Sequence, residues 1–383
     1  MGLTINDDGI YNSETFTVSC LDALKFGTAY ADIYDDIVIG TDSRCLAIFN
    51  ALSSGILSRS KNIWSCGNCT QAQLKYAITT LKLNAGIFIE SSCGNIKLIP
   101  FSKYGFSLDS TEEKTLSDTI SSVKLVSSYS DGKITDSSTL NEMYNSEVKY
   151  KQINFPPETN IQINSSNPLI KNLFHNICTD KKNSGEYRKN ITFQISADGL
   201  RASAYSFETG FVFYEKLILI CCISEFKKGN DIPLPYSFPV IADRLATQYG
   251  RSVFRFNPSS DKVNDISIKS ISLDFPFLND GAALIFSILK SMETEKKSLD
   301  NLINDIPEFT TTVKYINIKN NPEDTIKQIQ NTSENNICYE QEDGRIIAKA
   351  SKSGKSLILY AESYRAESAD ELCSSWMLGT GIR

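Results

Sequence analysis

The run Asp36-Ile37-Val38-Ile39-Gly40 is short, β-branched and closed by a glycine, as is typical of a buried strand. Residues 45–57 follow with apolar side chains at helical spacing. Residues 62–66 then have the composition of a second strand, and residues 71–81 that of a second helix. Residues 85–90 complete the series as a third strand. This alternation predicts a parallel sheet with both faces covered by helices.

Two loops after these strands are candidates for a site, because ligands bind beyond the carboxyl ends of parallel strands. They are residues 40–44 and residues 90–95, and Ser92 lies in the second. A nucleophilic serine needs a nearby base or metal. Without such a partner, Ser92 is an ordinary hydrogen-bonding loop residue.

The rest of the chain is divided by polar linkers. Residues 107–164 are rich in Ser, Thr, Lys and Asp, and residues 227–235 carry Lys, Gly, Asn, Asp and Pro. Residues 191–195 and 211–223 are predicted to be buried strands. The C-terminal segment is predicted to be a small α+β domain. The predicted domain boundaries are 1–125, 126–226, 227–308 and 309–383.

Length and charge restrict the class of protein. A chain of 383 residues is expected to form two to four domains. It carries 39 Lys and Arg against 45 Asp and Glu, a net charge of −6, which argues against nucleic-acid or membrane-surface binding. No apolar run approaches the roughly 18 residues of a spanning helix, and the N-terminus lacks signal-peptide features, so a cytoplasmic location is expected.

Cysteine and histidine offer little for metal chemistry. The ten cysteines are scattered, and buried thiols are the simplest interpretation. Cys66 and Cys69 have CxxC spacing, but a four-cysteine zinc site needs a second pair, which the sequence does not contain. His175 is the only histidine and lies in a helix-like pattern, where a structural role is favoured.

Residues 349–355 read Lys-Ala-Ser-Lys-Ser-Gly-Lys. Backbone amides and hydroxyls can form a nest for a tetrahedral anion, with lysines supplying positive charge. The alternative is a solvated hairpin turn whose lysines protect a sheet edge. In the same way Asp198, a single carboxylate in a turn, is typical of an Asx turn, whereas a divalent cation prefers several acidic oxygens.

The order of these loops resembles that of the α-D-phosphohexomutases, the phosphomannomutases and phosphoglucomutases, over nearly the whole chain. The similar segments are residues 6–12 (GTDGIRG in the family), 40–44 (GRDTR), 86–95 (GIMITASHNP), 95–97 (the end of NGIK), 193–200 (FDGDADRL), 280–281 and 349–355 (RPSGTEP). The resemblance implies three related α/β domains and a smaller C-terminal α+β domain around a central cleft.

The resemblance also implies a chemistry and its residues. Ser92 falls on the phosphorylated serine that passes a phosphoryl group to and from a hexose or hexosamine phosphate. Mg²⁺ would be held by the phosphoserine and by the residues at 194, 196 and 198. Positioning and charge neutralisation supply most of the rate in such phosphoryl transfer. The other catalytic candidates are Arg44, Lys97 and Arg201, and the candidates for gripping the distal phosphate are Lys349, Ser351, Lys352, Ser353, Gly354 and Lys355.

Several positions depart from the family pattern. Gln194 and Ser196 replace two of the three metal-ligand aspartates and leave only Asp198, which should weaken a divalent site severely. No segment similar to the family's GEQSGH sugar loop precedes Asp280, and residues 269–272 occupy that region. Three hypotheses follow: a mutase that acts through Ser92, a paralogue that binds a phosphosugar or a partner protein without turnover, and a purely structural or interaction protein.

Overall fold

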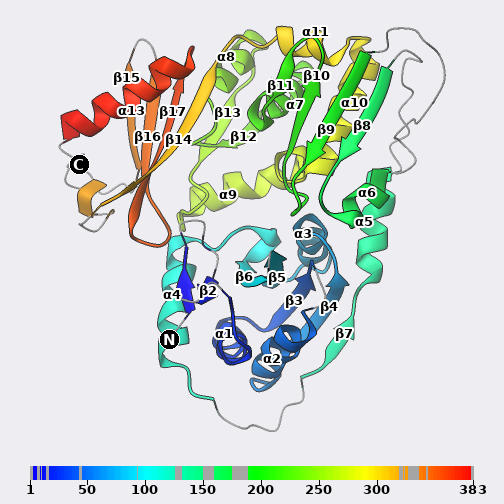
Figure 1. Cartoon of the computed structure of the whole chain (residues 1–383), viewed down its shortest axis with the longest axis vertical. Helices are drawn as coiled ribbons and strands as arrows, with labels where there is room; N and C mark the ends of the chain where they lie inside the picture. The colour runs from blue at the N-terminus through cyan, green and yellow to red at the C-terminus, as the bar shows by residue number, and fades with distance from the viewer. Residues whose placement is uncertain are drawn as a thin grey trace.

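The structure is a computed structural model of the chain. It describes residues 3–6, 9, 11–13, 17–42, 45–92, 94–125, 132–149, 159–174, 189–318, 322, 324–326, 336–341 and 344–380. His175 and Arg44 lie outside the described residues, and the side chain of Ser92 is not described. Four sheets define four domains, numbered here in chain order (Figure 1).

The first domain is built on a seven-stranded sheet. Its strands are β1 (Leu3–Ile5), β2 (Tyr11–Ser13), β3 (Asp36–Thr41), β4 (Asn62–Asn68), β5 (Gly86–Ser92), β6 (Asn95–Phe101) and β7 (Ile134–Asp136). Its helices are α1 (Cys20–Ile33), α2 (Leu46–Leu57), α3 (Gln71–Thr80) and α4 (Ser110–Ser122). The order is β1-β2-β6-β5-β3-β4-β7, with β3 parallel to β4 and β5, and with β5 and β6 as an antiparallel hairpin. The strands and helices predicted between residues 36 and 90 are therefore confirmed.

Both faces of this sheet are covered, as the sequence predicts. Ile37 and Ile39 of β3 belong to the core formed with α1 and α2. Val38 and Phe88 belong to the opposite core, together with Leu74 of α3. Alternate residues of a strand point to opposite faces, so one β-branched run can serve both cores.

The second domain holds a four-stranded sheet of order β11-β10-β9-β8. Its strands are β8 (Thr159–Asn164), β9 (Lys189–Ile195), β10 (Ala202–Ser206) and β11 (Gly210–Val212). Helices α5 (Thr139–Lys149), α6 (Pro168–Phe174), α7 (Tyr214–Lys227), α10 (Gly281–Glu295) and α11 (Leu299–Asn304) pack around it. The predicted strand at residues 191–195 is confirmed.

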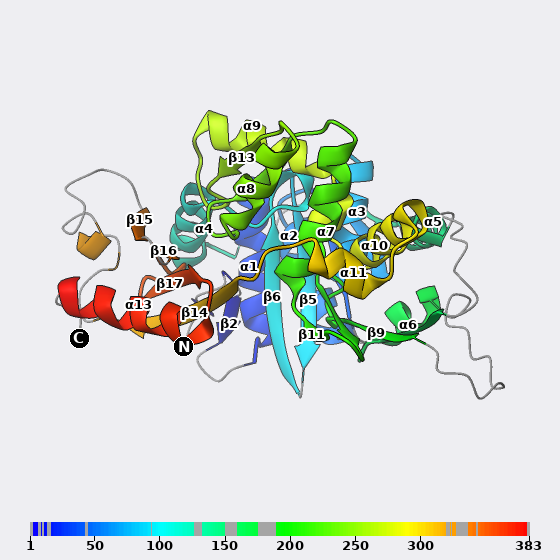
Figure 2. The same ribbon diagram turned by 90° about the horizontal axis from the view of Figure 1, so that it is seen from above.

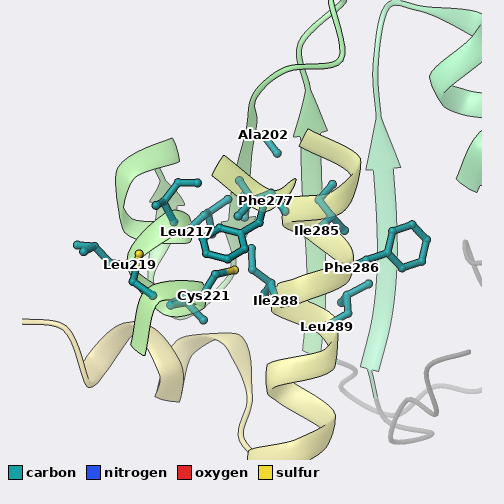
Figure 3. Close-up of a cluster of buried hydrophobic side chains, with 14 of the residues drawn as sticks. Ala202, Leu217, Leu219, Cys221, Phe277, Ile285, Phe286, Ile288 and Leu289 are labelled. Atoms are coloured by element: carbon teal, nitrogen blue, oxygen red, sulfur yellow. The ribbon is translucent and has the colours of Figure 1, made fainter. Parts of the chain in front are cut away.

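The predicted strand over residues 211–223 is wrong beyond Val212, because Tyr214–Lys227 form helix α7. Every residue from Leu217 to Ile223 is buried, so the run has no polar face to reveal a helical period. A short, wholly apolar run does not distinguish a buried strand from a buried helix. Figure 3 shows Leu217, Leu219 and Cys221 among the buried side chains of this core, where α7 packs against α10.

The third domain is small and shares the core of the second. Its two parallel strands are β12 (Ile232–Pro235) and β13 (Val253–Phe256), and its helices are α8 (Ile241–Gln248) and α9 (Val263–Ile271). Figure 1 shows α9 between the upper domains and the first domain.

The fourth domain is an antiparallel sheet of order β14-β17-β16-β15 with one helix. The strands are β14 (Thr310–Asn317), β15 (Asn336–Gln341), β16 (Gly344–Ala350) and β17 (Ser356–Ser363), and the helix is α13 (Ala366–Thr380). Ile346 and Leu359 pack with Cys373 and Trp376 of α13, which covers one face of the sheet (Figures 1 and 2). The α/β class with a smaller C-terminal α+β domain is therefore confirmed. In the described part of the chain, no helix combines the length and the apolar character that crossing a membrane requires.

Candidate functional site

A cleft of about 790 Å³ lies where the four domains meet. Small-molecule sites typically measure roughly 300–1,000 Å³, so the cleft has the size of a ligand site. All four domains contribute to its wall. The lining residues used below are Lys75, Phe106, Arg201, Tyr214, Phe238, Lys269, Thr311, Val313, Tyr315, Arg345, Ile347, Tyr360 and Glu362.

Three cations in the wall have no carboxylate partner in the part of the chain that the structure describes. The Lys75 ammonium lies 5.5 Å from the centre of the Phe101 ring, and the Lys269 ammonium lies 4.6 Å from that of Phe106. Lys269 also donates to the carbonyl of Pro258 at 3.1 Å. Arg201 stacks near Tyr214, 5.8 Å from its ring centre. Among the described residues, none of these cations forms an ion pair.

Lys75 and Lys269 are harder to keep protonated than a lysine in water. Burial lowers the pKa of Lys75 to about 8; the carboxylates of Asp198 and Asp280 oppose this shift, and repulsion from Lys269 and Arg201 adds to it. Burial likewise lowers the pKa of Lys269 to about 8. Desolvation disfavours the ammonium form, and neighbouring cations disfavour it further. An anion placed between these groups would stabilise all three.

Arg345 lines the same cleft but is already paired. It donates to the carbonyl of Phe238 at 2.8 Å and lies 3.4 Å from Glu362. Glu362 in turn accepts from the backbone N–H groups of Val240, at 2.7 Å, and Ile241, at 3.3 Å, where α8 begins. A carboxylate at a helix N-terminus is stabilised by the helix dipole. This pair therefore joins the fourth domain to the third.

Ser92 ends β5 and pairs with Asn95 of β6, so only two residues separate the strands of this hairpin. The backbone N–H of Ser91 donates to the Asp42 carboxylate at 2.9 Å. Lys97 lies 3.6 Å from Glu90 across the hairpin and is not a lining residue of the cleft. Lys97 is therefore the ion-pair partner of Glu90 and does not line the cleft.

The turn at Asp198 is held by hydrogen bonds between its own residues. Asp198 accepts from the Ser196 hydroxyl at 2.5 Å and from the Leu200 backbone N–H at 2.9 Å, which is an Asx turn between β9 and β10. Gly199, with φ of 81°, allows the reversal. The N-terminus of α3 touches the turn, because the Ala72 N–H donates to the Asp198 carbonyl at 3.4 Å.

These residues do not fit a magnesium ion. Mg²⁺ requires near-octahedral oxygen ligands, usually including carboxylates. The one carboxylate at the three expected positions, Asp198, is engaged inside its own turn, while Gln194 is exposed on β9. The described residues contain no cluster of three or more His, Cys, Asp or Glu suited to a metal.

The loop at residues 349–355 is a compact hairpin turn. The Ser351 hydroxyl accepts from the Ser356 N–H at 3.0 Å, and the Ser353 hydroxyl accepts from the Lys355 N–H at 3.2 Å. Gly354 adopts φ of 66° at its tip and is exposed, as is Lys355. The hydroxyls of Ser351 and Ser353, which the family resemblance assigns to phosphate binding, thus form hydrogen bonds within the turn.

Lys352 points out of this turn into the first domain. Its ammonium donates to the Leu108 carbonyl at 2.9 Å and forms a short ion pair with Glu113 of α4. A Cβ on Gly9 would lie 2.8 Å from Lys352, so the opening segment packs on the same pair. Lys349 instead lies 5.0 Å from the Tyr360 ring centre, on the sheet. The fold therefore brings together the opening segment, α4 and the hairpin.

The predicted and the observed groups overlap in one residue, since Arg201 lines the cleft. Lys75 and Lys269 were not predicted, because an isolated lysine in a helical pattern gives no signal of burial. In the sequence, residues 269–272 stand out only because they occupy the place of the family's sugar loop. Cys66 and Cys69 are buried free thiols, and burial raises the pKa of Cys66 to about 12, as expected for structural cysteines.

The chain is similar in structure to several solved phosphosugar mutases. No protein-family model matches the sequence, and no curated protein sequence matches it. A phosphoglucomutase/phosphomannomutase family protein from Burkholderia thailandensis superposes with a TM-score of 0.73 at 12% identity, over 99% of this chain and 98% of that chain. The phosphoglucomutase parafusin from Paramecium gives 0.59 at 10% identity, over 94% and 91%. An N-acetylglucosamine-phosphate mutase of the α-D-phosphohexomutase superfamily, in its product complex, gives 0.54 at 10% identity, over 100% and 97%. The chain therefore has the α-D-phosphohexomutase fold.

Proposed function

We propose that this protein binds a sugar phosphate in the cleft between its four domains and does not transfer the phosphoryl group through Ser92 and magnesium. The observation that carries the proposal is that Lys75, Lys269 and Arg201 line one cleft and form no ion pair with any described residue. The similar solved structures include mutases of hexose and hexosamine phosphates, which supports a phosphosugar as the ligand class.

The charge of the cleft favours a phosphate over a neutral sugar. Charge-assisted hydrogen bonds from lysine and arginine to phosphate are shorter and stronger than neutral ones. A phosphate monoester brings close to two negative charges at neutral pH. Its binding would offset the desolvation and the repulsion that together lower the pKa of Lys75.

The absence of turnover follows from the residues at the metal positions. Phosphoryl transfer depends on neutralising charge that develops on the transferred oxygens. Gln194 and Ser196 cannot supply the missing negative ligands, and the Asp198 carboxylate is held by Ser196 and Leu200. We therefore assign the cleft to recognition of the ligand.

Calorimetric titration with glucose 1-phosphate in the presence of EDTA tests the binding. We expect saturable 1:1 binding without added metal, and no binding of glucose. Lys290→Ala, which removes an exposed lysine on α10, serves as the control and should bind as the wild type does. Failure of glucose 1-phosphate and every other sugar phosphate to bind would refute the proposal.

A test of turnover uses Ser92 directly. After incubation with glucose 1,6-bisphosphate and Mg²⁺, we expect the intact mass of the protein to remain unchanged, because the residues at positions 194, 196 and 198 do not fit a magnesium ion. The Ser92→Ala variant provides the matched control. A phosphoryl adduct that forms on the wild type and is lost in Ser92→Ala would establish the mutase instead.

Binding should weaken as the pH rises from 7 to 9. A bound anion favours the ammonium forms of Lys75 and Lys269, whose pKa values are about 8, so affinity is full below that pH and falls as these groups deprotonate. The ligand stays dianionic throughout, since its second pKa is about 6. We expect a loss of roughly tenfold or more by pH 9. Calorimetry across this range measures it.

The control for this pH dependence is the double variant Lys75→Arg, Lys269→Arg. Arginine stays charged throughout the range, so its binding should change little with pH. An equally steep decline in this variant would show that other groups cause the effect.

A further inference from the structure

The two sides of the cleft differ in chemistry. The first three domains supply Lys75, Arg201 and Lys269. The fourth domain presents the face of its sheet that α13 does not cover, and Val313, Tyr315, Ile347 and Tyr360 form an apolar and aromatic area on it, beside the polar Thr311, Arg345 and Glu362. A ligand that fills the cleft therefore meets positive charge at one end and apolar surface at the other.

Strand register places the apolar side chains in one row. Val313 of β14 and Ile347 of β16 both lie opposite Tyr360 of β17, so the three form a continuous band across the sheet. Tyr315 lies two residues beyond Val313 on the same face of β14. All four residues line the cleft.

Two of these side chains are conspicuously accessible. Tyr315 is 55% exposed and Val313 is 47% exposed, although both lie in the wall of a cleft. Large apolar side chains gathered in a concave site are typical of surfaces that a ligand covers. An exposed aromatic ring is also a platform on which a flat ring can stack.

The two charged side chains of this wall are already engaged by the protein. Arg345 and Glu362 are engaged with each other, with Phe238 and with the start of α8. Specific sugar binding by hydrogen bonds needs donors and acceptors that are left to the ligand. The area formed by Val313, Tyr315, Ile347 and Tyr360 matches a planar group better than a second polyhydroxylated ring.

We infer that the ligand is a sugar phosphate whose sugar carries a planar aromatic group, as in a nucleoside 5′-monophosphate, with the phosphate at Lys75, Lys269 and Arg201 and the aromatic group against Tyr315. This inference rests on the proposed function, because it uses the same cleft and the same phosphate seat. It adds the chemical class of the group that the sugar carries, and it identifies the fourth domain as the part of the protein that contacts this group.

Competing titrations test the inference with AMP, ribose 5-phosphate and adenosine as probes. Ribose 5-phosphate lacks the base, and adenosine lacks the phosphate. We expect AMP to bind at least about tenfold more tightly than ribose 5-phosphate, in line with the energy of base stacking on aromatic side chains. Adenosine should bind more weakly than AMP, because it leaves the cations without an anion.

Variants of Tyr315 locate the effect. Tyr315→Ala should lower the affinity for AMP to that for ribose 5-phosphate and leave the affinity for ribose 5-phosphate unchanged. Tyr315→Phe keeps the ring and should bind AMP as the wild type does. The ring is half exposed, so both variants are expected to fold, and thermal unfolding checks this.

The outcomes separate the inference from the proposed function. If ribose 5-phosphate or glucose 1-phosphate binds as tightly as AMP, or if Tyr315→Ala weakens both phosphates equally, the aromatic assignment is wrong while the phosphate seat stands. If none of the phosphates binds, the proposed function itself is wrong.

Discussion

The double variant Lys75→Ala, Lys269→Ala is expected to lose at least about 100-fold in affinity for a phosphate monoester. Each charged hydrogen bond contributes about 1.5–3 kcal/mol, and about 1.4 kcal/mol corresponds to a factor of ten. Both lysines line the cleft, and both lack a carboxylate partner among the described residues. Calorimetry with glucose 1-phosphate or AMP at pH 7 measures the loss.

The stability of this double variant should change in the opposite sense to its binding. Both ammonium groups are desolvated, as their lowered pKa values indicate, so their removal relieves repulsion in the ligand-free protein. We expect a melting temperature equal to or above that of the wild type. A lower melting temperature would mean that the lysine stems contribute packing that outweighs the relief of repulsion.

A second double variant tests whether the phosphate binds at Lys75 and Lys269 or at the hairpin of residues 349–355. Lys349→Ala with Lys355→Ala also removes two positive charges, but from the turn in the fourth domain. We expect it to retain binding within about threefold, as typical for charges that are only weakly coupled to a site. If it abolishes binding while Lys75→Ala, Lys269→Ala does not, the hairpin is the phosphate site, as the family resemblance implies.

Lys352→Ala is expected to produce the largest loss of stability, about 3–5 kcal/mol, because it leaves a buried carboxylate without its partner. The side chains of Lys352 and Glu113 are only 18% and 11% exposed, and they join the fourth domain to the first. Replacement of both residues by apolar ones, Lys352→Met with Glu113→Leu, should recover much of that loss. Denaturant unfolding of the single and double variants gives the coupling free energy.

The pH dependence of Lys352→Ala provides a second check. Burial raises the pKa of Glu113, and the Lys352 ammonium opposes that rise. Without the ammonium, the folded-state pKa of Glu113 lies still further above its unfolded value. Stability is then lost as the pH rises through the folded pKa, so the defect should be smallest in acid. A defect that is independent of pH would show that the ion pair is not its cause.

This ion pair also explains why the hairpin is a poor phosphate grip as it stands. The Lys352 ammonium is engaged by Glu113 and by the Leu108 carbonyl, and the hydroxyls of Ser351 and Ser353 bond within the turn. Because Glu113 already balances the Lys352 ammonium, a phosphate at the turn would gain little from that charge. The basic composition of the loop indicated an anion site, whereas its contacts make it a link between domains.

The loops show where sequence reasoning is strong and where it stops. A single carboxylate in the turn at Asp198 indicated an Asx turn, and its hydrogen bonds to Ser196 and Leu200 have that form. The run at residues 217–223 misled because complete burial removes the polar face that distinguishes a helix from a strand. The partner of a charged side chain such as Lys352 lies more than 200 positions away in the sequence, beyond any local pattern.

The amino-acid sequence by itself determined the α/β class, the strands and helices of residues 36–90 and the likeness to the phosphohexomutase fold, because hydrophobic period and loop order are local properties of the chain. Only the tertiary structure decided which cations carry unbalanced charge. Lys75 and Lys269 face a shared cleft and form no ion pair among the described residues, whereas Lys97 and Lys352 face Glu90 and Glu113. Electrostatic interactions depend on distance in space and on exclusion of water, and neither quantity is written in the order of the residues.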